Sequence, residues 1–209
     1  MRRKPMLLRK LKREGKVKVH EVIGLIGTRG GTGVSYTGMM LAFYLGNELG
    51  KKTAFIECNN HGDLDLIQKA YEWSCENSAY FRFRNIVFYK NMSSERIADI
   101  LGENYEYVII DFGCELSDNL KEFQRCSMKA VVAGRSEWDI LKLFSFNRRY
   151  GVIRGSDTWY YLIPQADDKI VKRLENETHC RIRGIPFTEE PTCPNRSTKQ
   201  FFEELLRPI

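Results

Sequence analysis

GTRGGTGVSYTG, residues 27–38, follows directly on the apolar run EVIGLIG of residues 21–27. Glycine lets a backbone turn its N–H groups inward and approach an anion without an intervening Cβ. A helix predicted to begin near residue 35 adds the positive end of its dipole. A glycine-rich turn between a strand and a helix is the setting in which such a loop binds phosphate. The alternative is a turn that only packs the strand tightly against the helix.

The rest of the chain alternates short apolar runs with longer stretches of helical character. This alternation predicts an α/β fold, a doubly wound and mostly parallel sheet of about seven strands with helices on both faces. We expect strands at residues 21–27, 52–58, 85–89, 107–112, 129–134, 159–164 and 183–187. We expect helices at residues 35–49, 64–74, 94–101, 116–125, 137–150, 169–176 and 198–206. Ligands of such sheets bind beyond the carboxyl ends of the strands.

Length and composition indicate one globular domain. The chain has 209 residues, of which 43% are hydrophobic and 29% charged, and these are ordinary values for a single folded core. The sequence contains no run of about 18 apolar residues and no signal peptide, which predicts a cytoplasmic protein. The six cysteines form no CxxC pair, so we expect reduced, packed thiols.

Positive charge is concentrated at the start of the chain. Residues 1–18 carry nine Lys or Arg against Glu14, a local charge of +8, and the total of +6 therefore leaves −2 for the rest. We predict a basic tail or short helix at residues 1–18, with a helix possible at residues 5–14, and a single domain at residues 19–209. A basic tail ahead of a slightly acidic domain predicts docking of residues 2–18 on a membrane surface, a nucleic acid or an acidic partner. The alternative is a solvated tail without a partner.

The glycine loop resembles one known family in detail. The stretch VIGLIGTRGGTGVSYTG is similar to the opening strand–loop–helix unit of the MinD/ParA/nitrogenase iron-protein family of P-loop ATPases, which reads KGGxGK[ST] in that loop. Arg29 stands where the family has its signature lysine, and Val34 replaces the P-loop lysine. The resemblance implies that the nucleotide-binding residues are Arg29, Gly30, Gly31, Thr32, Gly33, Val34, Ser35 and Tyr36.

The same resemblance implies acidic and base-contacting residues further along. Asp111 ends the run YVIIDF, which resembles a Walker B segment, and with Ser35 it is expected to hold Mg²⁺, partly through water. Glu57 occupies the position of an aspartate that places the attacking water, although a carboxylate that caps a turn fits that position equally well. Gln165 and Phe187 fall where relatives border the nucleotide base.

An aromatic segment with interleaved arginines remains outside this pattern. Residues 79–84 read AYFRFR. The aromatic side chains could stack on nucleic-acid bases, but we favour a loop at the edge of the fold with solvated arginines.

The resemblance implies a switch protein that binds ATP or ADP with Mg²⁺ and forms a homodimer. Loss of the P-loop lysine removes a charge that neutralises the β- and γ-phosphates, so we expect binding to survive better than hydrolysis. Localisation proteins of pilus assembly of the TadZ/CpaE kind share altered Walker A loops. We therefore expect a localisation or scaffold protein, for a pilus, secretion or partition system, that stays in the cytoplasm or peripherally at the membrane. Two alternatives remain open: an active ATPase in which Arg29 compensates for Val34, and a scaffold that binds no nucleotide.

Overall fold

A computed structural model describes residues 21–71, 73 and 79–207. These residues contain a single eight-stranded sheet with the order β3-β4-β2-β5-β1-β6-β7-β8. The basic tail and the helix predicted at residues 5–14 lie outside the described residues. The strands are β1 Glu21–Gly27, β2 Thr53–Glu57, β3 Tyr80–Phe83, β4 Ile86–Tyr89, β5 Tyr107–Asp111, β6 Met128–Val132, β7 Tyr160–Pro164 and β8 Arg181–Ile185.

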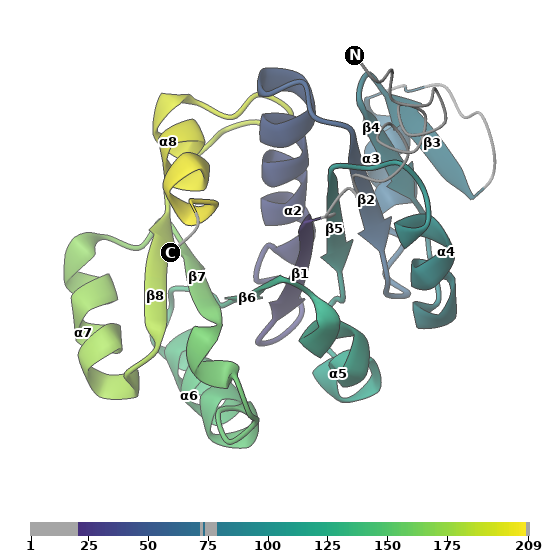
Figure 1. The fold of residues 1–209 in the computed structure, drawn as a ribbon. Helices are drawn as coiled ribbons and strands as arrows, with labels where there is room; N and C mark the ends of the chain where they lie inside the picture. Colours follow the sequence, from purple (N-terminus) through teal and green to yellow (C-terminus); the bar gives the residue numbers. More distant parts are fainter. Residues whose placement is uncertain (1–20, 72, 74–78, 208–209) are drawn as a thin grey trace, which may run out of the picture.

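Helices cover both faces of this sheet. They are α2 Val34–Phe43, α3 Asp63–Ala70, α4 Ile97–Leu101, α5 Leu116–Arg125, α6 Glu137–Tyr150, α7 Asp168–Thr178 and α8 Arg196–Leu205. Helices α2 and α8 pack on one face and α4, α5, α6 and α7 on the other (Figure 1). The predicted fold class, a doubly wound and mostly parallel α/β sheet, is confirmed. None of the helices in the described part of the chain has the length and apolar character that a bilayer-spanning segment needs.

The sheet has one strand more than the sequence pattern predicted. Residues 80–83, which we expected in an edge loop, form β3 and pair antiparallel with β4. Phe81 is fully buried and stacks on Phe88, with ring centroids 4.8 Å apart, while Arg82 is exposed. The interpretation of this segment as a loop was therefore wrong. Phe81 and Arg82 thus alternate between core and solvent, as expected of successive residues in a strand.

The first helix is fitted closely to the sheet. Gly33 has φ 90° and precedes α2, a conformation that glycine adopts without strain. Gly38 lies so close to β2 that an added Cβ would come within 2.5 Å of the Phe55 ring. The helix continues past Phe43 as a five-residue π-helical turn, η1 Tyr44–Glu48, in which the Leu49 N–H donates to the Tyr44 carbonyl. The predicted helix at residues 35–49 is thus present, but with a change of hydrogen-bond pattern.

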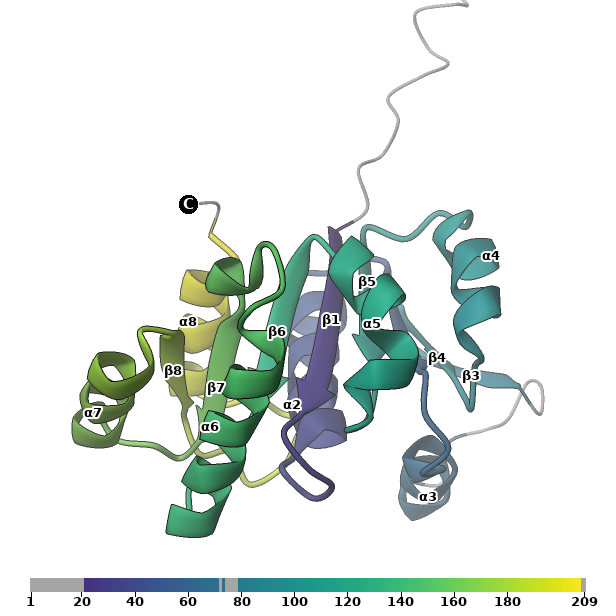
Figure 2. The ribbon, with the colours of Figure 1, turned by 90° about the horizontal axis from the view of Figure 1, so that it is seen from below.

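The seven parallel strands place their carboxyl ends at one edge of the sheet. β5 and β1 are neighbours, and β2 lies on the other side of β5. Figure 2 shows the glycine loop after β1 and helix α3 after β2 at the same end of the sheet. Residues that are distant in sequence therefore meet beyond β1, β2 and β5.

Candidate functional site

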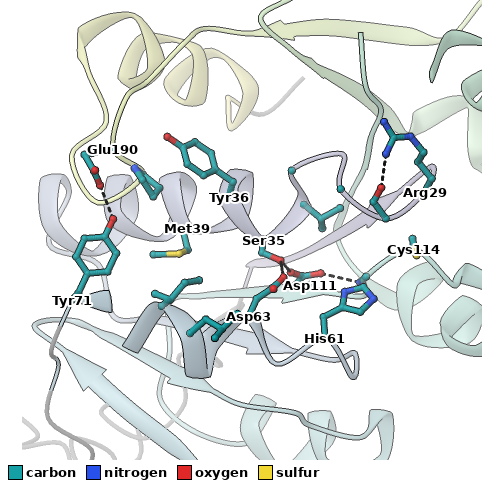
Figure 3. A pocket seen from close by; sticks show the side chains of 18 of the residues that line it. Arg29, Ser35, Tyr36, Met39, His61, Asp63, Tyr71, Asp111, Cys114 and Glu190 are labelled. Carbon is teal, nitrogen blue, oxygen red and sulfur yellow. Dashed lines mark hydrogen bonds between the residues drawn. The ribbon is translucent and has the colours of Figure 1, made fainter. Parts of the chain in front are cut away.

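A cavity of about 530 Å³ opens at this edge of the sheet. The glycine loop and the start of α2 form one wall, α3 forms another, and residues 189–191 of the β8–α8 loop close the far side (Figure 3). Gly31, with φ 77°, and Gly33 hold the loop in a left-handed backbone conformation that other residues rarely adopt. The structure thus brings the predicted loop to the wall of a cavity.

Ser35 stands between two carboxylates in this cavity. Its Oγ lies 2.7 Å from Asp111 Oδ2 and 2.8 Å from Asp63 Oδ2. A serine hydroxyl has one hydrogen, so it donates to only one of these oxygens at a time. The remaining contact joins two oxygen atoms that both carry lone pairs. A set of three such oxygens suits a hard divalent cation, which would relieve that repulsion.

Asp111 is buried and held by its neighbours. Its Oδ1 accepts hydrogen bonds from the Gly113 N–H at 2.8 Å and from Asn59 Nδ2 at 3.1 Å. Burial raises the pKa of the Asp111 carboxyl above its ordinary value, the hydrogen bonds from Ser35 and Gly113 oppose this, and the nearby charge of Asp63 adds to it. The fold therefore holds an Asp111 carboxylate that a cation would stabilise.

Val34, where the family resemblance led us to expect a lysine, is the first residue of α2 and lines the cavity. Its side chain is buried and belongs to the core between α2 and the sheet. A Cβ added to Gly27 would come within 3.0 Å of Val34 Cγ2. The side chain thus packs against the beginning of the glycine loop and offers no charge to a ligand.

Arg29 is held by an aspartate of its own chain. Its Nε donates to Asp139 Oδ1 at 2.5 Å, and its NH1 donates to the Gly30 carbonyl at 2.6 Å. Asp139 lies in the first turn of α6, where it also forms a capping box with Ser136. The Arg29 guanidinium lowers the pKa of the Asp139 carboxyl. In Figure 3 the side chain of Arg29 lies at the rim, apart from Ser35 and Asp111.

Glu57 ends β2 and is almost fully buried. Its Oε1 accepts the Leu64 N–H at 3.2 Å, and its Oε2 accepts the Asn91 N–H at 3.1 Å. Both oxygens therefore bind backbone of the segments that follow β2 and β4. Glu57 does not line the cavity in the described residues, and its contacts are those of a carboxylate that caps a turn.

Tyr36, Gln165 and Phe187 lie around a second, smaller cavity of about 250 Å³ on the other side of the glycine loop, which Thr32 also lines. The Tyr36 hydroxyl lies 2.8 Å from the Thr188 carbonyl and 3.0 Å from the Glu189 carbonyl, and by donating to either it links α2 to the β8–α8 loop. Arg135 donates to Gln165 Oε1 at 3.1 Å. The structure thus gathers all three predicted residues near the loop.

Sequence reasoning did not single out Asp63, Asn59 or His61. Asp63 begins α3 directly after Gly62, which has φ 72°. Asn59 positions Asp111, and His61 lines the cavity. The signal was their place after the carboxyl end of β2, the strand beside β5, since neighbouring parallel strands bring such residues together.

The cavity carries an excess of negative charge. Among the described residues that line it, Arg29 is the one Lys or Arg, whereas four are acidic: Asp63, Asp111, Glu189 and Glu190. A phosphate group placed here without a cation would meet mostly repulsion.

A parallel sheet with a glycine loop between β1 and α2, and an aspartate at the end of the neighbouring β5, defines a P-loop NTPase-like fold. The structural neighbours of this chain are ParA/MinD-family ATPases. No family model and no curated protein sequence matches the chain.

Three solved structures illustrate the likeness. A ParA family ATPase from Chlorobium tepidum TLS shares 16% identity and a TM-score of 0.61, over 82% of this chain and 86% of that one. A putative plasmid partition protein from Borrelia burgdorferi B31, bound to AMPPNP, has 17% sequence identity and a TM-score of 0.60. The match covers 90% of this chain and 97% of that one. The septum site-determining protein MinD from Pyrococcus horikoshii OT3, complexed with Mg-ADP, has 13% sequence identity and a TM-score of 0.59. The match covers 90% of this chain and 94% of that one. At such identities the likeness shows the shared fold.

Proposed function

We propose that this chain binds ATP or ADP with Mg²⁺ in the larger cavity and acts as a nucleotide-dependent switch with weak or lost ATPase activity. The observation that carries the proposal is the position of the Ser35 hydroxyl between the carboxylates of Asp111 and Asp63 at the foot of the glycine loop. Two proteins with the same fold bind AMPPNP and Mg-ADP. A bound Mg²⁺ would supply the positive charge that neutralises phosphate, and Ser35, Asp111 and Asp63 would hold it.

The excess of acidic side chains makes this binding depend on the cation. Without the P-loop lysine, the cavity has Arg29 as its cationic side chain, and that group is bound to Asp139. Gly31 and Gly33 have no Cβ, so the backbone of the loop can approach a phosphate closely. The affinity for phosphate would then come from backbone amides and the metal ion. Hydrolysis loses more than binding does, since the missing lysine would act on charge that develops only in the transition state.

The biological role follows as part of the same proposal. A switch of this kind closes a homodimer around nucleotide and serves as a localisation or scaffold protein for a pilus, secretion or partition system. Residues 2–18, with their dense positive charge, are proposed to dock it on an anionic surface. Light scattering with and without Mg²⁺-ATP tests the dimer, and salt-dependent cosedimentation with anionic vesicles tests the tail.

Calorimetry of ADP and ATP with Mg²⁺ or with EDTA tests the central claim. We expect binding with Mg²⁺, loss in EDTA, and loss in Ser35→Ala and Asp111→Asn. Ser117→Ala, an exposed serine on α5, is the matched control and should bind like the parent chain. No binding in any condition would replace this proposal with that of a scaffold free of nucleotide, which the acidic cavity favours.

An active ATPase remains the second candidate, and it needs Arg29 to reach phosphate. The Arg29–Asp139 contact opposes this in the chain on its own. Hydrolysis that is lost in Arg29→Ala but retained in Arg135→Ala would favour it over the weak-activity proposal.

A further inference from the structure

Helix α3 places Asp63 at the cavity but buries few apolar side chains of its own. Among its eight residues only Leu64 and Gln68 are buried, and Leu66 is 64% exposed. Gly62 precedes it without a side-chain cap. An eight-residue helix whose own N-cap residue offers no side-chain cap has little intrinsic stability, so the direction of Asp63 must be fixed by contacts with neighbouring segments.

Lys90 provides such a contact. It follows directly after β4, its side chain is 7% exposed, and its Nζ lies 2.8 Å from Asp65 Oδ1. The ammonium also lies 5.7 Å from the centre of the Phe81 ring, in the range of a cation–π contact. Lysine is rarely buried to this degree without a charged partner. The pair therefore attaches the first turn of α3 to the end of β4.

Asp65 and Asp63 project from different sides of α3. Residues two apart on a helix are rotated by about 200° around its axis. Lys90 therefore holds the side of the helix opposite to the one from which Asp63 reaches Ser35. A rotation of α3 that breaks the contact between Lys90 and Asp65 would therefore also move Asp63 away from Ser35.

Glu57 connects the same two segments. Its carboxylate accepts the Leu64 N–H on α3 and the Asn91 N–H directly after Lys90. The Met92 N–H donates to the Glu57 carbonyl at 2.7 Å. The end of β2 thus joins the start of α3 to the residues after β4. These contacts hold the backbone next to Lys90 in place, and the Lys90 side chain then holds Asp65.

We infer that Lys90 is a positioning residue that, through Asp65, holds α3 in the orientation in which Asp63 faces Ser35 and Asp111. This inference rests on the proposed function, because Asp63 there holds Mg²⁺. A group that orients a metal ligand changes metal affinity without touching the metal.

The test compares Lys90→Met with the conservative Lys90→Arg in the full-length chain. We expect hydrogen exchange of the α3 amides to become faster in Lys90→Met without nucleotide. We also expect the Mg²⁺ concentration that half-saturates ADP binding to rise about 10-fold or more. Lys90→Arg keeps the positive charge, so its hydrogen exchange in α3 and its Mg²⁺ dependence should stay close to those of the parent chain. Lys51→Met is the matched control, since it breaks a lysine–carboxylate pair with Glu106 elsewhere on the molecule.

Asp65→Asn removes the same pair from its exposed side and serves where Lys90→Met does not fold. Unchanged exchange in α3, or an equal Mg²⁺ shift in Lys51→Met, would overturn the inference. If Asp63→Asn shifts the Mg²⁺ dependence and Lys90→Met does not, the positioning role fails while the proposed function stands. If the parent chain binds no ADP, the proposed function fails, and the exchange of α3 alone decides whether Lys90 orients it.

Discussion

The guanidinium of Arg29 lies 2.5 Å from the carboxylate of Asp139, so the cation at the edge of the glycine loop is held within its own chain. Because Arg29 holds the pKa of Asp139 below its ordinary value, this contact stabilises the fold at neutral pH. Its contribution is lost as the pH falls through the lowered pKa of the folded state. The pair is thus strongest under the conditions in which a phosphate would compete for Arg29.

Asp139→Asn should release Arg29 toward phosphate. We expect affinity for Mg²⁺-ADP to rise at least about tenfold, because a hydrogen bond to a charged group is worth roughly 1.5–3 kcal/mol. Ser136→Ala is the control: it removes the cap of α6 at a cost of about 1 kcal/mol and leaves the ion pair. Equal affinities in the two variants would show that Arg29 makes no contact with the ligand.

Val34→Lys should restore a charge that the loop lacks. The added ammonium can reach the cavity that Val34 lines, and we expect about tenfold tighter binding of ADP, measured by calorimetry. Val34→Ala removes the same packing without adding charge, so it separates the two effects. Tighter binding in both variants would point to relief of crowding and not to charge.

Asp111→Asn should stabilise the ligand-free protein at neutral pH. Burial raises the pKa of Asp111 in the fold, so its charged form costs stability above that pKa, and the cost fades as the pH falls through it. We expect a higher Tm than that of the parent chain at pH 7 and a difference that shrinks on acidification. Mg²⁺ should raise the Tm of the parent chain alone. A variant that melts lower at pH 7 would contradict this.

Glu57→Gln separates catalysis from structure. An amide retains one acceptor oxygen, so either Leu64 or Asn91 loses its hydrogen bond, and we expect a loss of about 1–3 kcal/mol in urea unfolding. Glu106→Gln, a less buried glutamate, is the comparison. Unchanged stability together with lost hydrolysis would restore the catalytic interpretation of Glu57.

Gly38→Ala should destabilise the contact between α2 and the sheet. The added methyl would lie within 2.5 Å of the Phe55 ring, and overpacking of this kind costs about 1–3 kcal/mol. Gly30→Ala has open space around its Cβ and should be nearly neutral in thermal unfolding. Equal stability of the two variants would mean that α2 moves freely away from β2.

The fold was largely predictable because parallel strands buried on both faces leave continuous apolar runs. The bounds of α5 and α6 were predicted to the residue. β3 was missed because Arg82 and the nearby Arg84 suggested solvent, whereas period-2 alternation of Phe81 with Arg82 is typical of an edge strand.

The site was predictable where it is local in sequence and not where it depends on topology. The glycine loop from Gly30 to Ser35 is continuous, so its pattern could be read directly. Asp63 and Lys90 could not be found in this way, because their roles depend on β4, β2 and β5 being neighbours. The contact between Arg29 and Asp139 spans 110 residues and has no local signal.

The π-helical turn at residues 44–48 has a consequence for evolution. A π turn holds about one residue more than the α-helical turn it replaces, so it can accommodate the insertion of a single residue. The extra residue is absorbed where Gly46 touches Ile86, at the far end of α2 from the glycine loop. A homologue whose helix remains α-helical there should be one residue shorter between its loop and its second strand, with the loop itself unchanged. The length of this interval is thus a marker of descent that can be scored in sequences too divergent to align elsewhere.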